Sequence, residues 1–253
     1  MFKNAIVRKP SKSMVKGLTS ARLGKPDHDL ACQQHQDYVN ALQECGLQVT
    51  VLDALEAYPD ACFVEDVALF TPKGAILTHP GAASRQGEVQ FIAPAISHFY
   101  PNPDSIVAPG HVDAGDIMMV GGHFYIGLSN RTNNQGAHQM IALLAKQGLS
   151  GSMVKMSALL HLKTGVSYLE NNNLLTFGEL HSHPDFSDFN RIEISQEESY
   201  AANSVWINGS VLVPKGFPKA LAAIQALGYD TKELAMSEFQ KLDGGLSCLS
   251  LRF

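Results

Sequence analysis

Short apolar runs separated by turn residues recur along the chain, and the first clear set predicts two strands, a helix and a third strand. The stretch "VEDVALFTPKGAILTH" at 64–79 divides into two β-like runs around a Pro-Lys-Gly turn. Four apolar residues at helical spacing then predict a helix at about 87–99. The extended segment "DSIVAP" follows it. Together these patterns predict one ββαβ module.

The same order of elements recurs elsewhere. "GDIMMVGGHFYIGLS" predicts a hairpin, which is followed by the helix "NNQGAHQMIALLAKQG" and the strand "SMVKM". "NSVWINGSVLVP" contains an Asn-Gly turn, a strong hairpin signal, and precedes the predicted helix "FPKALAAIQALG" and strand "YDTKELA". "YLENNNLLTFGEL" predicts a fourth, weaker hairpin. The N-terminal "NAIVR", a helix at about 28–45 and "LQVTVL" are expected to share a fifth unit with the C-terminal strand.

About five ββαβ modules with irregular spacing predict an α/β fold with short strands inside and helices outside. This pattern favours a closed, propeller-like ring over a doubly wound parallel sheet. No stretch reads as a linker, so a single domain is predicted over residues 1–253. The two termini are expected to meet within one module.

Composition narrows the class of protein. The chain is 45% hydrophobic and 17% charged, which is typical of a globular protein with a sizeable core. Its formal net charge is −5 and it has no lysine/arginine run, so no nucleic-acid surface is indicated. No apolar run approaches the length of a membrane span, and the N-terminus lacks the apolar core of a signal peptide. The four cysteines have no CxxC spacing, so we expect reduced thiols and a cytoplasmic location.

Carboxylates stand at equivalent places in the repeated pattern. Glu65 and Asp66 head one hairpin, Asp113 and Asp116 head the next, and Asp60 lies close to the first pair in sequence. Each carboxylate alone is explained by capping a turn. Several together predict a negatively charged site for a cation, and a guanidinium suits it because its planar N–H donors pair with carboxylates.

Cys248 follows a Gly-Gly pair on a β-type run at the end of the chain. It is either a buried small hydrophobe or a nucleophile. His161, after an apolar stretch, is either a structural histidine or a general acid/base oriented by Asp113. None of the ten histidines lies in an HExxH motif or a paired Cys/His spacing, and "HSHPD" at 181–185 resembles a solvated loop, so no metal site is predicted.

Six segments together resemble the bacterial dimethylarginine dimethylaminohydrolase family: "LTSARLGKPD", "PDACFVED", "AGDIMMVGGHFYIGLSNRTN", "LHLKTG", "EESYAAN" and "DGGLSCLSLRF". They occur in the family's order and span nearly the whole chain. The family belongs to the guanidino-modifying (amidinotransferase) superfamily, so the resemblance implies a five-bladed α/β propeller, or pentein, with ββαβ modules around a pseudo-fivefold axis. Arginine and agmatine deiminases typically carry histidine before the nucleophilic cysteine, whereas this chain has Ser247.

The resemblance also implies roles for ten residues. Cys248 matches the nucleophile and His161 the general acid/base, while Asp113, which matches the residue that orients the histidine, stands where bacterial relatives carry glutamate and other members carry aspartate. The other seven match substrate-binding positions: Asp60, Glu65 and Asp66 at the guanidinium and amine ends, Arg85 and Arg131 at the α-carboxylate, Phe63 in an apolar wall, and Leu18 on a mobile loop.

The implied activity is hydrolysis of Nω-methylated arginine to citrulline and methylamine or dimethylamine through a covalent cysteine intermediate, without cofactor or metal. Three alternatives stay open: another guanidine hydrolase such as an arginine deiminase, an amidinotransferase, and a catalytically silent amino-acid-binding protein. The expected partner is a small molecule, not nucleic acid or membrane. A homodimer is compatible with the sequence.

Overall fold

The structure is a computed structural model that describes residues 1–253. It contains five three-stranded sheets of one topology, in which the central strand pairs antiparallel with one neighbour and parallel with the other. The chain groups into two compact units, one of residues 65–202 and one of residues 1–64 with 203–253. The single domain over 1–253 stays a prediction.

The unit of residues 65–202 holds three of the sheets. Their strands are β3 (Ala68–Thr71), β4 (Gly74–Leu77) and β5 (Asp104–Ser105); β6 (Ile117–Val120), β7 (His123–Leu128) and β8 (Ser150–Lys155); and β9 (Val166–Tyr168), β10 (Asn173–Thr176) and β11 (Asn190–Glu193). The helix α2 (Val89–Phe99) connects β4 to β5, and α3 (Asn134–Lys146) connects β7 to β8. Both predicted ββαβ modules in this part of the chain are therefore present.

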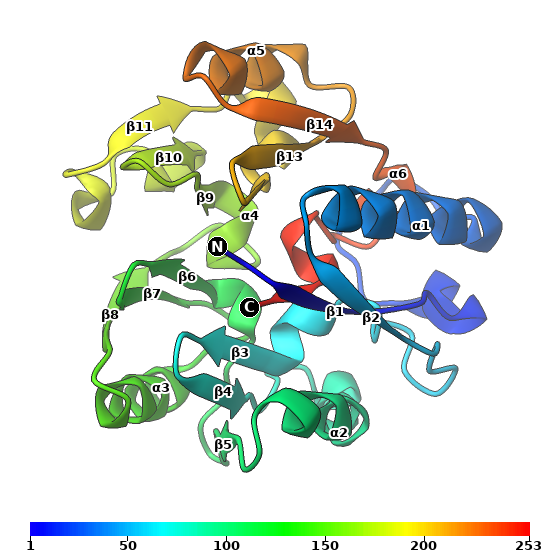
Figure 1. The fold of residues 1–253 in the computed structure, drawn as a ribbon, viewed down its shortest axis with the longest axis vertical. Helices are drawn as coiled ribbons and strands as arrows, with labels where there is room; N and C mark the ends of the chain where they lie inside the picture. Colours follow the sequence, from blue (N-terminus) through cyan, green and yellow to red (C-terminus); the bar gives the residue numbers. More distant parts are fainter. The chain divides into compact units, whose positions relative to one another are not determined.

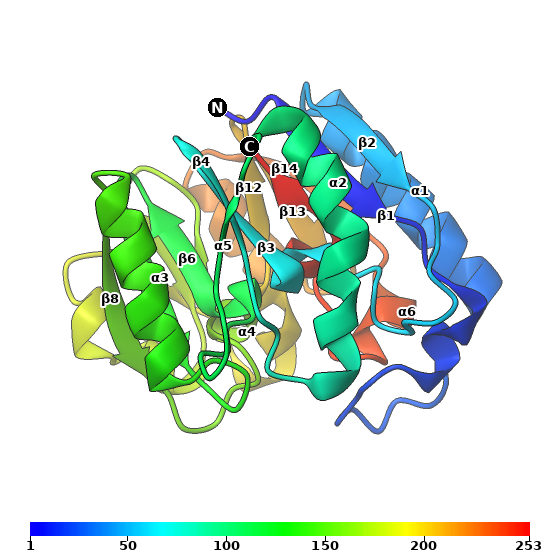
Figure 2. The ribbon, with the colours of Figure 1, turned by 90° about the horizontal axis from the view of Figure 1, so that it is seen from below.

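The helix α3 shows how local sequence and packing combine. The side chain of Asn133 caps its first turn by accepting a 2.8 Å hydrogen bond from the N–H of Gly136. Ala137, Met140 and Leu144 recur at helical spacing and are completely buried. This apolar face packs against β7 and β8, and Figure 2 shows α3 alongside β8.

The module built on β9 and β10 departs from the expected pattern. Its hairpin forms as predicted, with Glu170, Asn171 and Asn172 all at positive φ in the turn. No α-helix connects β10 to β11, however; two short 3₁₀ helices, η5 (Gly178–Leu180) and η6 (Pro184–Phe186), take its place. Two residues interrupt this segment: Gly178, which has a positive φ, and Pro184. The segment also lacks a long apolar run at helical spacing. The ββαβ order that was expected in each module therefore lacks its α-helix in this one.

The unit of residues 1–64 and 203–253 holds the other two sheets. Their strands are β1 (Asn4–Arg8), β2 (Gln48–Leu52) and β15 (Leu251–Arg252), and β12 (Val205–Ile207), β13 (Ser210–Pro214) and β14 (Asp230–Leu234). The helix α1 (His28–Glu44) packs against β2 in Figure 1, α5 (Pro218–Ala226) packs against β14, and α6 (Ser237–Gln240) packs against α1. Asn208 and Gly209 both have positive φ in the β12–β13 turn, as the Asn-Gly signal predicts.

The two ends of the chain meet in one sheet, as predicted. β1 pairs antiparallel with β15, and the N–H of Lys3 donates a 2.8 Å hydrogen bond to the carbonyl of Phe253. Cys248, expected on a β-type run, lies instead in the 3₁₀ helix η8 (Ser247–Leu249) just before β15. None of the helices has the length and apolar character that a membrane crossing requires.

Candidate active site

Two 3₁₀ turns at the starts of hairpins bring acidic residues together in the unit of residues 65–202. Asp66 lies in η2 (Val64–Val67) before β3, and Asp113 immediately precedes η4 (Ala114–Asp116) before β6. Gly115 permits their approach, because a Cβ there would lie 2.6 Å from Oδ1 of Asp66 and 2.8 Å from Nδ1 of His161. Its N–H donates a 3.1 Å hydrogen bond to Asp66.

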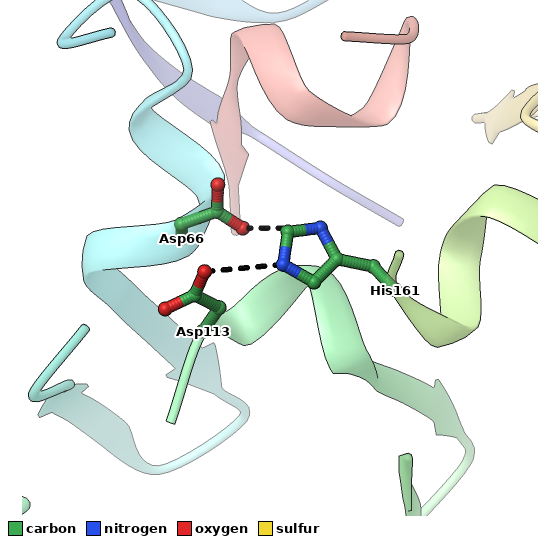
Figure 3. Close-up of side chains that lie close together, drawn as sticks. All are labelled: Asp66, Asp113 and His161. Carbon is green, nitrogen blue, oxygen red and sulfur yellow. Dashed lines mark hydrogen bonds and ion pairs between the residues drawn. The ribbon is translucent and has the colours of Figure 1, made fainter. Parts of the chain in front are cut away.

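His161 lies between these two carboxylates (Figure 3). It immediately precedes the short helix α4 (Leu162–Gly165), and its side chain is buried. Its Nε2 is 3.1 Å from Oδ2 of Asp113, and its Nδ1 is 4.0 Å from Oδ1 of Asp66. The structure therefore brings together the predicted acid/base histidine, its predicted orienting carboxylate and one predicted guanidinium ligand.

The carboxylates make His161 a stronger base than an isolated histidine. Burial alone lowers the pKa of His161, but the charges of Asp66 and Asp116 and the hydrogen bond with Asp113 outweigh it and raise the pKa to about 9. Burial raises the pKa of Asp113, but the hydrogen bond with His161, the charges of His161 and Arg85 and the N–H of Gly81 together lower it. The resting arrangement is therefore an imidazolium beside carboxylates, able to donate a proton.

Asp113 is held from several sides. Its Oδ1 accepts a 2.9 Å hydrogen bond from the N–H of Gly81, and its own N–H donates to Oγ1 of Thr132 at 3.2 Å. Nη1 of Arg131 lies 3.6 Å from its Oδ2. The short aspartate side chain thus reaches His161 within hydrogen-bond distance.

The two arginines predicted to bind a carboxylate differ in the structure. Arg85 is buried, and its guanidinium bonds with Asp66 and with Glu88, the latter at 2.7–3.2 Å. Burial alone lowers the pKa of Arg85. The charges of Glu88 and Asp66 outweigh this effect and raise the pKa above its usual value, so Arg85 stays protonated. The side chain of Arg131 is 20% exposed. Only Arg131 is therefore accessible to solvent, while Arg85 already holds two carboxylates.

Two further partners in this cluster were not expected from the sequence. Glu88, three residues after Arg85, bonds with it from the same 3₁₀ helix. Lys163 donates a 2.6 Å hydrogen bond to Glu65. The i,i+3 spacing of Arg85 and Glu88 was a readable signal, whereas Lys163 and Glu65 are 98 residues apart.

Cys248 lies in a tight turn of the unit that contains both termini. The N–H of Gly245 points at its Sγ at 3.4 Å. Asn203 holds the residue before the cysteine by two hydrogen bonds, accepting from the N–H of Ser247 at 2.9 Å and donating to its Oγ at 3.0 Å. A Cβ on Gly245 would lie 2.5 Å from Asn203, so the Gly-Gly pair lets the turn pack against its neighbours.

The remaining predicted residues lie in the same unit as Cys248. Phe63 is buried, packs edge-on against Phe239 and covers Gly244, where a Cβ would lie 2.1 Å from its ring. Asp60 is buried and accepts a 2.9 Å hydrogen bond from the N–H of Leu18, a residue that is 40% exposed. Asp60 thus anchors the backbone of the loop that carries Leu18.

Asp66, Asp113 and His161 each offer one atom, all within 4.8 Å of one another, a spacing that a metal ion could bridge. Protein partners already bond these groups: Arg85 and Gly115 hold Asp66, and Asp113 bonds with His161. These partners account for the arrangement, so we assign no metal ligands. The expectation of metal-free chemistry stays a prediction.

Comparison with known proteins extends the resemblance to the whole chain. A family model described as N,N dimethylarginine dimethylhydrolase, eukaryotic, matches residues 21–156. The N(G),N(G)-dimethylarginine dimethylaminohydrolase of Pseudomonas aeruginosa is 55% identical over 254 aligned positions, covering 100% of both chains. That of Streptomyces coelicolor is 33% identical over 99% of this chain and 96% of its own.

Solved structures agree. Two dimethylarginine dimethylaminohydrolase structures each superpose with a TM-score of 0.99 at 55% identity over 100% of both chains. One is a histidine-to-glycine variant as an adduct with S-methyl-L-thiocitrulline, and the other, from Pseudomonas aeruginosa, is a cysteine-to-serine variant complexed with citrulline. The N-terminal domain of a cyanobacterial arginine dihydrolase, 18% identical with a TM-score of 0.87, covers 100% of this chain and 97% of its own and shares the fold. The predicted class, a five-module α/β propeller, is confirmed, and the chain belongs to the dimethylarginine dimethylaminohydrolase family.

Proposed function

We propose that this protein hydrolyses Nω-methylated L-arginine to L-citrulline and methylamine or dimethylamine. The observation that carries the proposal is the buried His161 bonded to Asp113 beside Asp66, in a chain 55% identical to a named dimethylarginine dimethylaminohydrolase over its whole length. A protonated histidine among carboxylates suits a cationic substrate whose leaving group is an amine.

In the first half-reaction, the thiolate of Cys248 attacks the central guanidinium carbon and forms a tetrahedral adduct. His161, whose pKa of about 9 keeps it protonated at neutral pH, transfers its proton to the departing alkylamine nitrogen. The C–N bond breaks, and the carbon remains bonded to sulfur as an S-alkylthiouronium.

In the second half-reaction, the now neutral His161 accepts a proton from water, and the resulting hydroxide attacks the same carbon. The C–S bond breaks and the thiolate of Cys248 is restored. The added hydroxyl releases its proton to solvent as it becomes the ureido carbonyl, and citrulline leaves. Asp113 keeps the imidazole oriented through both steps, by the 3.1 Å contact with Nε2.

The substrate's charged ends match the remaining predicted residues. We assign the guanidinium to Asp66 with support from Glu65, the α-amino group to Asp60, and the α-carboxylate chiefly to Arg131. The guanidinium of Arg85 already bonds with Asp66 and Glu88. Arg85 can therefore bind a substrate carboxylate only if its bond with one of these two residues breaks. Phe63 and Leu18 then supply an apolar wall and a covering loop.

The proposal is tested by incubating the purified chain with asymmetric dimethylarginine, monomethylarginine, arginine and agmatine, and measuring citrulline and the released amine. Cys248→Ser protein is the matched control. Citrulline and dimethylamine in equal amounts from dimethylarginine, and little product from arginine, support the proposal. Ammonia from arginine as the main product would instead indicate a deiminase.

An amidinotransferase and a catalytically silent binding protein would each give a distinct outcome in the same assay. An amidinotransferase needs an added amine acceptor and transfers the amidino group to it, whereas a silent binding protein shows saturable binding without product. We also propose a cytoplasmic location, because the four cysteines have no CxxC spacing and are too sparse for a disulfide scaffold.

A further inference from the structure

Asp116 is a completely buried carboxylate for which the proposed reaction has no role. It ends the 3₁₀ turn that follows Asp113. Its Oδ1 accepts a 2.9 Å hydrogen bond from the N–H of Leu162, the residue next to His161. Its Oδ2 accepts a 2.6 Å hydrogen bond from the hydroxyl of Ser129.

Ser129 extends this contact to the turn that carries Arg131. Its hydroxyl oxygen accepts hydrogen bonds from the N–H of Arg131 at 2.9 Å and of Thr132 at 3.2 Å. Oγ1 of Thr132 in turn accepts from the N–H of Asp113 at 3.2 Å. One buried carboxylate thus joins three backbone segments, each carrying a residue of the proposed site.

The charge of Asp116 also acts on His161. Burial raises the pKa of Asp116 to about 6, opposed by the charge of His161 and by hydrogen bonds from Ser129, Thr132 and the N–H of Leu162. The charges that act on His161 include those of Asp66, Asp113 and Asp116. Arg85 bonds with Asp66, Arg131 lies 3.6 Å from Asp113, and Lys163, two residues along the chain from His161, pairs with Glu65. Above a pH of about 6, Asp116 is therefore ionised and contributes to holding the proton on His161.

We propose that Asp116 is a positioning residue for the hydrolysis: it fixes the backbone beside His161 and the turn that carries Arg131, and its charge keeps His161 protonated. The proposal rests on the proposed function and adds to it a residue that touches neither substrate nor reacting atoms. It makes two separable claims, one on charge and one on the position of Arg131.

Asp116→Asn tests the claim on charge, because an asparagine oxygen still accepts from Leu162 while the negative charge is removed. The expected result is a fall in the pKa of His161 by about one unit. It is measured by the NMR titration of the His161 C2–H resonance, assigned by its loss in His161→Ala protein. The alkaline limb of kcat should move to lower pH by the same amount, since the first step needs the protonated imidazole.

Ser129→Ala tests the claim on position, because it keeps the charge of Asp116 and removes the hydroxyl that bonds with Asp116 and with the N–H groups of Arg131 and Thr132, leaving only the hydrogen bond from Thr132 between Asp116 and the turn. We expect the KM for dimethylarginine to rise about two- to tenfold, because this is the effect on binding that the loss of neutral hydrogen bonds usually has. The titration of His161 should match the parent protein. Asp188→Asn, which removes a charge from an exposed position, should match the parent in both measurements.

An unchanged titration of His161 in folded Asp116→Asn protein overturns the charge claim, and a parent-like KM in Ser129→Ala overturns the position claim. If Asp116→Asn fails to fold, the charge claim is tested by titrating His161 in Asp116→Ser protein, with the same outcomes. Failure of the proposed function is distinguishable: the parent then releases no citrulline, while the NMR titration still decides whether Asp116 acts on His161.

Discussion

The residues proposed for acid/base chemistry and the turn that carries the nucleophile are built from different interactions. His161, Asp66, Asp113 and Asp116 form a buried cluster of charged groups, with Arg85 neutralising part of it. Cys248 lies in a turn held by neutral hydrogen bonds from Asn203 and by close packing around two glycines.

The difference separates two kinds of control. Charges in a buried cluster shift proton affinity, because few water molecules screen them. A neutral turn leaves charge unchanged and determines mainly where the sulfur lies. Substitutions in the charged cluster should therefore change pH dependence, and substitutions in the turn should change rate at constant pH dependence.

The largest effect is expected for Cys248→Ser. A serine hydroxyl is a much weaker nucleophile than a thiolate, so citrulline formation should fall by ~10⁴-fold or more. The circular dichroism spectrum should not change, because the backbone bonds around Ser247 remain. Substantial residual turnover by folded variant protein would exclude Cys248 as the nucleophile.

His161→Ala is expected to slow hydrolysis of dimethylarginine by ~10²–10⁴-fold, the usual contribution of general acid/base catalysis. S-methyl-L-thiocitrulline, whose thiolate leaving group needs no proton, should be spared in the first step and accumulate as a covalent adduct detectable by mass spectrometry. In the parent, activity should decline as the pH rises past about 9, where His161 loses its proton. His98→Ala, at an exposed histidine on α2, is the control, and an equal loss in the rate of the first step with both substrates would contradict the role of His161 as general acid.

Arg85→Ala and Arg131→Ala are expected to differ, although the family resemblance assigns both to one task. Removing Arg85 leaves Asp66 and Glu88 buried without their cation, so the free energy of unfolding should fall by ~3–5 kcal/mol. Arg131→Ala should change stability little and raise KM for dimethylarginine by about ten- to a hundredfold, with little effect on agmatine, which lacks the carboxylate.

Urea unfolding and steady-state kinetics on both arginine variants provide these measurements. Equal stability of the two variants would show that the burial of Arg85 has no energetic consequence. A parent-like KM in Arg131→Ala would instead mean that the substrate is not bound through an α-carboxylate.

The smallest effect is expected for Asn203→Ala, which removes both side-chain hydrogen bonds to Ser247. We expect kcat to fall about three- to tenfold, because neutral hydrogen bonds contribute modestly and the packing of Gly245 remains. The alkylation rate of Cys248 by iodoacetamide, followed by mass spectrometry of its peptide, should change as well. Ser247→Ala, which removes only the hydroxyl, should have a smaller effect, and a shifted titration of His161 in either variant would contradict the separation of the two regions.

Much of the fold was predictable because hairpins and helices are local features. The Asn-Gly turn at 208–209 and the apolar face of α3 follow from conformational preference and periodicity over a dozen residues. The absence of an α-helix between β10 and β11 was not predicted, because the ββαβ pattern was extended to a segment whose own residues interrupt a helix. The 3₁₀ turn that contains Cys248 was not predicted either. It directly precedes the short strand β15, and the residues of both together have the pattern of one β-strand.

By itself, the sequence determined the modules, the identity of the reactive groups and the family, since these depend on residue type and local order. Only the tertiary structure decided the partner of each charge. It paired Arg85 with Asp66, paired Glu65 with Lys163 98 residues away, and joined Asp116 to the backbone beside His161. The physical reason is that the energy of a charge depends on its burial and on groups within a few ångströms, and chain folding alone brings those groups together.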